Sequence, residues 1–183
     1  MAALGRELQR RNLARTNLEL EHARVLASTD GLTGLLNREG FLSAFDGYET
    51  NPSGTLFFID LDGFKSINDT IGHAGGDSAL REVAKQIRRN FRGDDIVSRF
   101  GGDEFVAYAP LLTEQDVVSS IAQRIVTSVN DAVLAGDAQL SCSVGIAVRR
   151  NFAPDAHGLI AEADRAMYRA KQDGGGRVVA AWV

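Results

Sequence analysis

Two short acidic segments hold the residue types most able to carry chemistry. The first, residues 55–60, is an apolar run that ends in Asp60. The second contains Asp103 and Glu104, which follow a Gly-Gly pair. A buried strand that delivers an aspartate at its end is typical of a site for a hard cation, which prefers carboxylate oxygens. If the two segments are neighbours in one sheet, Asp60 and Asp103 can share a Mg²⁺ ion.

The Gly-Gly pair lies between two apolar runs, 96–98 and 106–109, and this arrangement predicts a β-hairpin. Glycine suits both central positions of a primed turn, because they need positive φ. Side chains alternate along a strand, so Asp103 and Glu104 are expected on opposite faces, with only one pointing into any given site. The alternative for this stretch is a solvent-exposed acidic turn.

Several further motifs follow one another in a fixed order, and together they resemble those of the GGDEF-domain diguanylate cyclases. That family carries Gly-Gly-Asp/Glu-Glu-Phe on a hairpin, which matches residues 101–105. The resemblance extends from Asp30 nearly to the C-terminus. The other segments that carry it are residues 30–38, 60–69, 72–77, 143–147 and 163–171.

The resemblance implies condensation of two GTP into cyclic di-GMP with release of two pyrophosphates, each 3′-OH attacking the α-phosphate of the other nucleotide. It also implies that Mg²⁺, with Mn²⁺ as an alternative, is bound by Asp60, Asp103 and the backbone carbonyl of Leu61. Asp103 is in addition the best candidate to help deprotonate the 3′-OH. Glu104 is kept as a secondary metal ligand or base.

By the same resemblance, four residues contact the triphosphate of GTP. Gly63 and Phe64 offer backbone N–H groups, Lys65 neutralises phosphate charge, and Lys171 reaches the terminal phosphates. The alternative for Lys65 is an exposed helix lysine. The chain departs from the family where Gly175 replaces a phosphate-facing arginine; Arg177 could substitute, and weaker GTP binding is expected.

Asn68 and Asp77 match the guanine-reading residues of the family. A carboxylate can accept from guanine N1 and N2, a donor pair that adenine lacks, and this would reject ATP. His73 matches a position near the nucleotide but could equally cap the following helix. Asp62 and Asp69 are interpreted as residues that satisfy turns.

Arg92 and Asp95 stand upstream of the hairpin at the spacing of the family's inhibitory Arg-x-x-Asp motif, which binds the product. An arginine fork and a carboxylate suit a guanine edge or a phosphate. The alternative is a helix-terminal cation beside a loop acid. A second arginine is normally needed, and Arg124 is a weak candidate.

Composition excludes several classes of protein. The chain has 183 residues, 44% of them hydrophobic, a net charge of −4 and a pI near 5.4, which argues against DNA or RNA binding. Its single cysteine, Cys142, lies in an apolar run and builds no disulfide framework. No run is long enough to span a membrane and no signal peptide is evident, so a cytoplasmic location is expected.

The elements that position these residues alternate between strand and helix, with one hairpin among them. Strands are expected at 55–60, at the hairpin, at 140–148 and at 177–183. Helices are expected from Asn37 through 45, at 64–68 with a break at Gly72, from about 77 to 93, at 113–133 and at 159–172. The fold class is therefore α+β: a ferredoxin-like, nucleotide-cyclase-like βααββαβ sheet with helices packed on it.

Residues 1–29 are rich in helix formers and precede the catalytic domain, residues 30–183. They are read as an N-terminal signalling helix, either a single amphipathic helix or, as we favour, a coiled coil that makes a homodimer. In the family such a helix commonly links an upstream sensor to the domain. The favoured function is a dimeric, product-inhibited cyclase; the alternative is a non-catalytic cyclic di-GMP receptor or GTP-sensing module.

Overall fold

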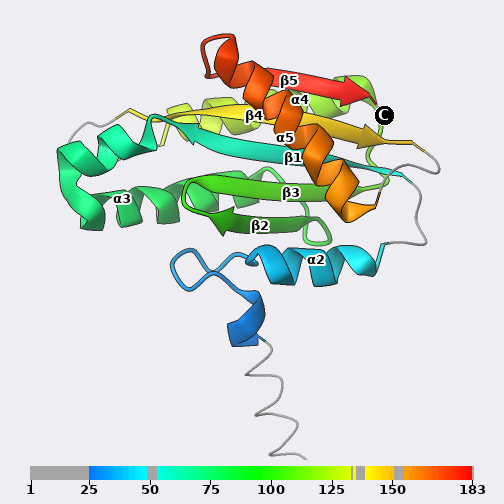
Figure 1. Cartoon of the computed structure of the whole chain (residues 1–183), viewed down its shortest axis with the longest axis horizontal. Helices are drawn as coiled ribbons and strands as arrows, with labels where there is room; N and C mark the ends of the chain where they lie inside the picture. The colour runs from blue at the N-terminus through cyan, green and yellow to red at the C-terminus, as the bar shows by residue number, and fades with distance from the viewer. Residues whose placement is uncertain (1–24, 49–52, 133, 135–138, 151–154, 183) are drawn as a thin grey trace, which may run out of the picture.

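A five-stranded sheet with the order β2-β3-β1-β4-β5 forms the centre of the computed structural model, which describes residues 25–48, 53–132, 134, 139–150 and 155–182 (Figure 1). All neighbouring strands are antiparallel except β4 and β5, which are parallel. The strands are β1 Gly54–Asp62, β2 Ile96–Gly101, β3 Glu104–Pro110, β4 Ser141–Arg149 and β5 Val178–Trp182.

Helices cover both faces of this sheet and divide the core into two clusters. On one face, α3 (Phe64–Arg89) and α4 (Gln115–Asn130) pack on Phe57, Ile59 and Leu61 of β1. On the other, α2 (Arg38–Asp46) and α5 (Ala156–Gln172) pack on Leu56 and Phe58. The central strand β1 is therefore apolar on both faces from Leu56 to Ile59, and its charged side chains, Asp60 and Asp62, lie where it ends.

Local signals in the sequence account for where helices α2 and α5 begin. Asn37 caps α2, since its Oδ1 accepts from the Gly40 N–H at 2.8 Å, as the sequence predicted. Asp155 caps α5 in the same way through Gly158 at 2.8 Å, and this helix begins three residues earlier than expected. The predicted strands and helices are otherwise found within a few residues of their expected bounds, as is usual at element ends.

Helix α3 is bent at Gly72, whose φ of 74° and ψ of 167° lie outside the helical region. The break was expected there, but the second helical segment begins directly after Gly72 rather than at about residue 77. Gly75 and Gly76 permit this, because a Cβ on either would meet a side chain of the first segment. A methyl group on Gly76 would lie 1.9 Å from Asn68 Oδ1.

The β2–β3 hairpin is confirmed, but its turn is shifted by one residue. Gly101 pairs with Glu104, so the two loop residues are Gly102 and Asp103 rather than the two glycines. Both glycines do have positive φ, 153° for Gly101 and 54° for Gly102. The register shifts between Arg99 and Gly101, and this bulge places Asp103 in the turn itself.

The α+β fold class is confirmed, with α5 and β5 following the βααββαβ core. Of the predicted N-terminal helix, only residues 25–28 are described, and they are helical; the coiled-coil prediction lies on residues outside the described part. Within the described residues, no helix is long and apolar enough to cross a membrane.

Gly145 of β4 allows α5 to pack closely on the sheet. A Cβ at this position would lie 2.0 Å from the Ala163 carbonyl oxygen and 2.2 Å from the Met167 nitrogen, both backbone atoms of α5. We expect Gly145→Ala to lower the free energy of unfolding by about 1–3 kcal/mol, because α5 must move outward. Urea denaturation measures this loss. Gly31→Ala, where a Cβ meets nothing within 4 Å, is the control; an equal loss in both variants would contradict the packing argument.

Candidate active site

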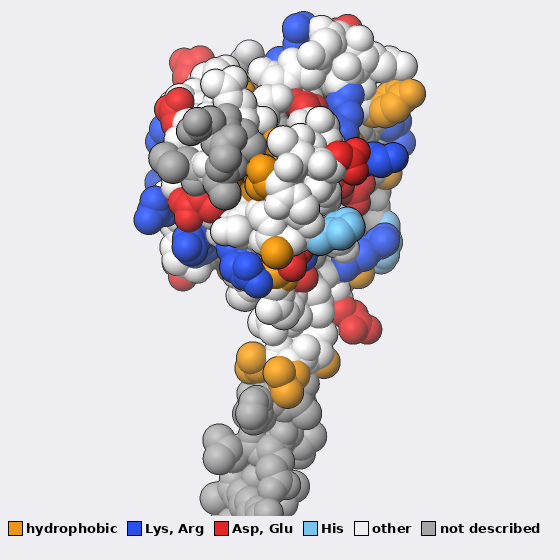
Figure 2. All heavy atoms as spheres, turned by 90° about the vertical axis from the view of Figure 1, so that its left-hand side faces the viewer, with side chains coloured by type: hydrophobic (Ala, Val, Ile, Leu, Met, Phe, Trp, Pro, Cys, Tyr) orange, Lys and Arg blue, Asp and Glu red, His pale blue; other side chains and the backbone are white. Residues whose placement is uncertain are grey.

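The register of the three central strands brings polar side chains together at one end of the sheet. Asp60 near the end of β1 pairs with Glu104 on β3 and with Ser143 on β4, so the three side chains share the α5 face. This end lies at the left of Figure 1 and faces the viewer in Figure 2, where acidic and basic side chains lie next to each other. The expectation that the two acidic segments are sheet neighbours is confirmed.

Asp60 is the buried member of this group, with 7% of its surface exposed. Its Oδ1 forms an ion pair with Lys171 Nζ but accepts no hydrogen bond of regular geometry. Burial raises the pKa of Asp60 and outweighs the opposing effect of Lys171, while the charges of Asp103 and Asp62 raise it further. The site thus holds a desolvated carboxylate among other negative charges.

Glu104 and Asp103 complete the acidic group. Burial raises the pKa of Glu104, and the charges of Asp60, Asp103 and Asp164 act in the same direction. Asp103 is tied to β1 through its backbone, because its carbonyl accepts from the Leu61 N–H at 3.2 Å. Strand alternation, from which only one of Asp103 and Glu104 was expected in the site, does not apply to Asp103, because β3 begins at Glu104. Asp103 is a turn residue, and both charges act on the Asp60 site.

Asp62, interpreted from the sequence as a turn residue, instead joins β1 to the segment between α5 and β5. Its carboxylate accepts from Ser143 Oγ at 2.8 Å, from Ser141 Oγ at 3.0 Å and from the Gly176 N–H at 2.8 Å. A Cβ on Gly175 would lie 3.2 Å from this carboxylate, at a φ of 73°. Gly175, where the resemblance led us to expect an arginine, therefore lies against the Asp62 carboxylate, and a side chain there would be crowded. No local sequence signal could identify a partner 114 residues away.

The start of α3 follows β1 directly and presents free backbone donors. Gly63, in the left-handed region with φ of 71°, is the N-cap residue and makes no side-chain capping bond. Helix N-termini with uncapped N–H groups favour phosphate groups. Phe64 is buried, whereas Lys65 is exposed beside it.

The bend in α3 brings the predicted guanine-reading residues of its two segments near each other. The Asn68 side chain lies against Gly76, the residue before Asp77. Asn68 is partly buried, while His73 and Asp77 are exposed. The bend thus places Asn68 next to the residue that precedes Asp77.

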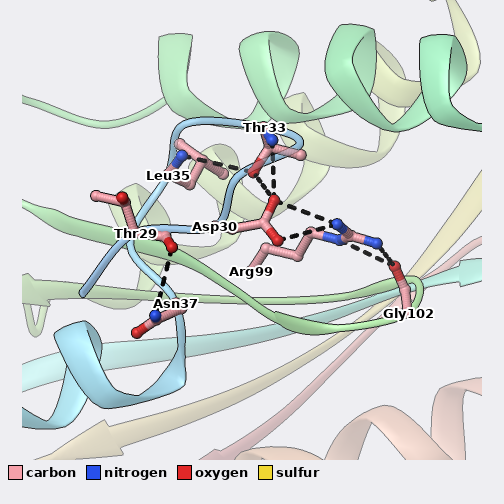
Figure 3. A network of polar contacts seen from close by, with 7 residues as sticks. All are labelled: Thr29, Asp30, Thr33, Leu35, Asn37, Arg99 and Gly102. Atoms are coloured by element: carbon pink, nitrogen blue, oxygen red, sulfur yellow. Dashed lines mark hydrogen bonds and ion pairs between the residues drawn. The ribbon is translucent and has the colours of Figure 1, made fainter. Parts of the chain in front are cut away.

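Arg99 links the hairpin turn to the segment that leads into the domain (Figure 3). Its Nη1 donates to both oxygens of Asp30 at 3.1 and 3.2 Å, and its Nη2 and Nε donate to the Gly102 carbonyl at 2.7 and 3.0 Å. Thr33 donates to Asp30 through its backbone and its hydroxyl. The turn that carries Asp103 is thus held from outside the sheet, a role that the sequence analysis did not assign to Arg99.

The predicted inhibitory residues lie at the opposite end of β2, about 17 Å along the strand from the hairpin turn. Arg92, Asp95 and Arg124 line one surface cavity of about 580 Å³. Asp95 accepts from the Arg92 N–H at 2.7 Å and so closes the turn between them. Arg88, which sequence reasoning missed, supports the same turn by donating to the carbonyls of Arg92, Gly93 and Asp95 at 2.5, 3.3 and 3.0 Å.

The residues at the end of β1 suit a hard divalent cation. Among the described residues, no three Asp, Glu, His or Cys side chains are arranged to hold an ion by themselves. The predicted set, however, needs two carboxylates and a backbone carbonyl, and the buried Asp60 Oδ1 has Lys171 as its one partner among the described residues. All of these donors are oxygens, which fits Mg²⁺ or Mn²⁺.

Comparisons with a family model and with curated proteins point to the same family. The family described as "Diguanylate cyclase, GGDEF domain" matches residues 27–177. The chain is 40% identical over 169 residues to diguanylate cyclase TpbB of Pseudomonas aeruginosa, and 38% identical over 162 residues to cyclic di-GMP phosphodiesterase PdeR of Escherichia coli. These matches cover 87% and 86% of this chain, but only 38% and 24% of the two relatives.

Solved structures agree with this result. The coiled coil and GGDEF domain of DgcB from Caulobacter crescentus, in complex with c-di-GMP, superimposes with a TM-score of 0.83 at 31% identity, covering 94% of this chain and 95% of that one. Diguanylate cyclase SiaD of Pseudomonas aeruginosa, in complex with its activator SiaC, gives 0.78 at 30% identity, covering 97% and 70%.

The Asp30–Arg99 pair should stabilise the fold in a pH-dependent way. Burial alone would raise the pKa of Asp30, but hydrogen bonds from Thr33 and Arg99 outweigh it and leave the pKa below its ordinary value. Its stabilisation is therefore complete above the unfolded-state pKa of about 4 and is lost as the pH falls through the folded-state pKa. We expect Asp30→Asn to lower the free energy of unfolding by about 1–2 kcal/mol at pH 7.

Urea denaturation at pH 7 and at pH 3 measures this difference, which should shrink at the lower pH because the stabilisation starts to be lost once the pH falls below the unfolded-state pKa. Asp46→Asn, at an exposed residue of α2, is the matched control and should cost little at either pH. A loss in Asp30→Asn of the same size at both pH values would contradict a charge-assisted contact.

Proposed function

The chain belongs to the GGDEF-domain family, and from this premise we propose that it is a diguanylate cyclase that condenses two GTP into cyclic di-GMP. One observation carries the proposal: Asp60, Asp103 and Glu104 converge beside Lys171 and the uncapped start of α3. Relatives of this domain include both TpbB, named a diguanylate cyclase, and PdeR, named a phosphodiesterase. Family membership alone therefore does not establish the activity.

In this proposal Asp60, Asp103 and the Leu61 carbonyl hold a divalent cation, Mg²⁺ or Mn²⁺. The ion would shield phosphate charge and lower the pKa of the attacking hydroxyl. The burial of Asp60 supports its role, because among the described residues Lys171 is the one partner of its Oδ1, and an exchangeable ion pair leaves this desolvated carboxylate able to bind a cation.

Asp103 or Glu104 is the base that takes the proton from the 3′-OH. The raised pKa of Glu104 supports its candidacy, because a general base works best when its pKa approaches the operating pH. Glu104 also lies directly across from Asp60. We therefore treat Glu104 and Asp103 as equal candidates for the base, although the sequence favoured Asp103.

The nucleotide is bound along α3 and the end of α5. The N–H groups of Gly63 and Phe64, together with Lys65, would contact the phosphates, and Lys171 would reach the terminal ones. Asn68 and Asp77 would read the guanine edge, with His73 at the rim of the site. Uncapped donors at the α3 start and the packing of Asn68 beside Gly76 support this orientation.

One domain would hold one GTP, so two domains must face each other to form two identical bonds. We assign residues 30–183 to the catalytic domain and residues 1–29 to a helix that pairs two copies and connects to any upstream sensor. Val25 and Leu26, 53% and 68% exposed, support an apolar contact there, and Figure 2 shows apolar side chains where the described part begins.

The cavity beside Arg92 and Asp95 is the proposed inhibitory site for cyclic di-GMP. Arg124 supplies the second arginine, since it lines the same cavity. The alternative function is a receptor that binds cyclic di-GMP without turnover. It would use this cavity alone, and the acidic group would have no catalytic role. The GGDEF domain of DgcB was solved in complex with c-di-GMP, which supports product binding by such a domain.

Cyclase activity is tested by incubating the protein with GTP and Mg²⁺ and measuring cyclic di-GMP. We expect the initial rate to rise with the square of protein concentration when the protein is dilute, because pairing limits the reaction. Asp103→Ala should lower the rate at least about 10²-fold. Asp46→Ala, at an exposed residue of α2, is the matched control and should leave it unchanged. Absence of cyclic di-GMP even at high protein concentration would contradict the cyclase and leave the receptor.

The inhibitory site is tested by titration calorimetry with cyclic di-GMP. We expect Arg92→Ala to weaken binding at least about 30-fold, because it removes one of the two arginines that would bind the ligand in this cavity. The same variant should lose product inhibition but keep its initial rate. Arg81→Ala, an exposed arginine on α3, is the matched control. Unchanged binding in Arg92→Ala would remove this cavity from the proposal.

A further inference from the structure

Lys171 makes the ion pair with the buried carboxylate at the centre of the acidic group. Its Nζ contacts Asp60 Oδ1, the oxygen that makes no regular hydrogen bond. The side chain of Asp60 is 10% exposed and that of Lys171 is 35% exposed, so the pair lies at the mouth of the site. Lys171 therefore balances a cluster of negative charge that would otherwise be desolvated and unpaired.

The backbone of Lys171 is held while its side chain has room to move. The Gly174 N–H donates to the Lys171 carbonyl at 3.1 Å, and the Gly175 N–H donates to Ala170 at 3.0 Å. Gly176 is in turn bound to Asp62, the next acidic residue of β1. The end of α5 is thus fixed to the strand that carries Asp60, and a flexible four-carbon stem lets the ammonium group reach more than one partner.

We propose, on the premise of the function proposed above, that Lys171 is a tethered cation which holds the place of the divalent ion at Asp60 until nucleotide binds. In this proposal the ion takes the position of the ammonium group beside Asp60 Oδ1, and the repulsion between the two positive charges favours the departure of Lys171 when the ion binds. The phosphates of GTP offer the displaced ammonium a new anionic partner. The consequence is an order of binding: the free protein binds metal weakly, and metal and nucleotide arrive together.

A purely structural ion pair would behave differently. If the pair only stabilises the fold and Asp60 binds no ion, removal of its lysine would destabilise the fold and would create no metal binding that depends on Asp60. A place-holding lysine also suppresses metal binding, so its removal must strengthen that binding. The two roles are therefore separated by an equilibrium measurement without nucleotide or turnover.

The experiment is Mn²⁺ titration of the nucleotide-free protein, followed by electron paramagnetic resonance of free Mn²⁺. We expect Lys171→Met, which keeps the length of the side chain without its charge, to bind Mn²⁺ at least tenfold more tightly than the native protein. Lys171→Arg keeps the charge and should bind as weakly as the native protein. Lys85→Met removes an exposed lysine paired with Glu82 on α3 and should change nothing.

Thermal unfolding gives a second readout on the same proteins. Lys171→Met should unfold at a lower temperature than the native protein without metal, and Mn²⁺ should restore more of its stability than it does for the native protein. Lys171→Gln serves the same purpose if the methionine variant does not fold. Asp60→Asn combined with Lys171→Met should abolish the gain in Mn²⁺ affinity.

The proposal and its premise fail in distinguishable ways. Native protein with Mn²⁺ and a non-hydrolysable GTP analogue should bind metal, and Asp60→Asn should not; failure of this arm removes the proposed metal and nucleotide site. If this arm succeeds but Lys171→Met and Lys171→Gln bind Mn²⁺ no more tightly than the native protein without nucleotide, the place-holding role is wrong and the cyclase proposal stands.

Discussion

The burial of the Asp60 carboxylate at the end of β1 is the constraint on which the rest of the site depends. The strand register sets Glu104 directly across from it, and Asp103 and Asp62 add their charges nearby. Like charges in a desolvated place oppose folding, so the fold must supply compensation. It does so with Lys171 from the end of α5 and with two serines and a backbone N–H that satisfy Asp62. Elements far apart in sequence are thereby joined at one end of the sheet.

The same requirement explains why glycine recurs around the site. Gly145 brings α5 against β4, Gly76 lets the two segments of α3 lie together, and Gly175 passes beside Asp62. A side chain would meet the backbone of α5 at Gly145, the Asn68 side chain at Gly76 and the Asp62 carboxylate at Gly175. The loss of the family's arginine at position 175 fits this pattern, because the left-handed backbone there and the nearby Asp62 carboxylate leave little room for it.

Much of the fold could be predicted because its signals are local. The apolar run before Asp60, the cap at Asn37 and the break at Gly72 each depend on a few neighbouring residues. The turn position was wrong by one residue because a bulge between Arg99 and Gly101 shifts the register, and alternation fails across a bulge. The roles of Arg88 and Asp62 were missed for a different reason. Arg88 binds only backbone carbonyls, and Asp62 binds groups from two distant segments, so neither leaves a pattern in the sequence.

Strand β2 connects the two ends of this molecule that the proposed function uses. It begins after the Arg92–Asp95 turn and ends at the hairpin that carries Asp103. Between these ends the segment leading into the domain is bound to it, since Leu36 forms a bridge with Ser98 and accepts from the Arg99 N–H at 2.8 Å. β2 is an edge strand: β3 pairs with it along one side, and on the other side the bridge to Leu36 is the contact that the described residues make with its backbone. The attachment near its middle is suited to fixing how the domain sits on its N-terminal helix.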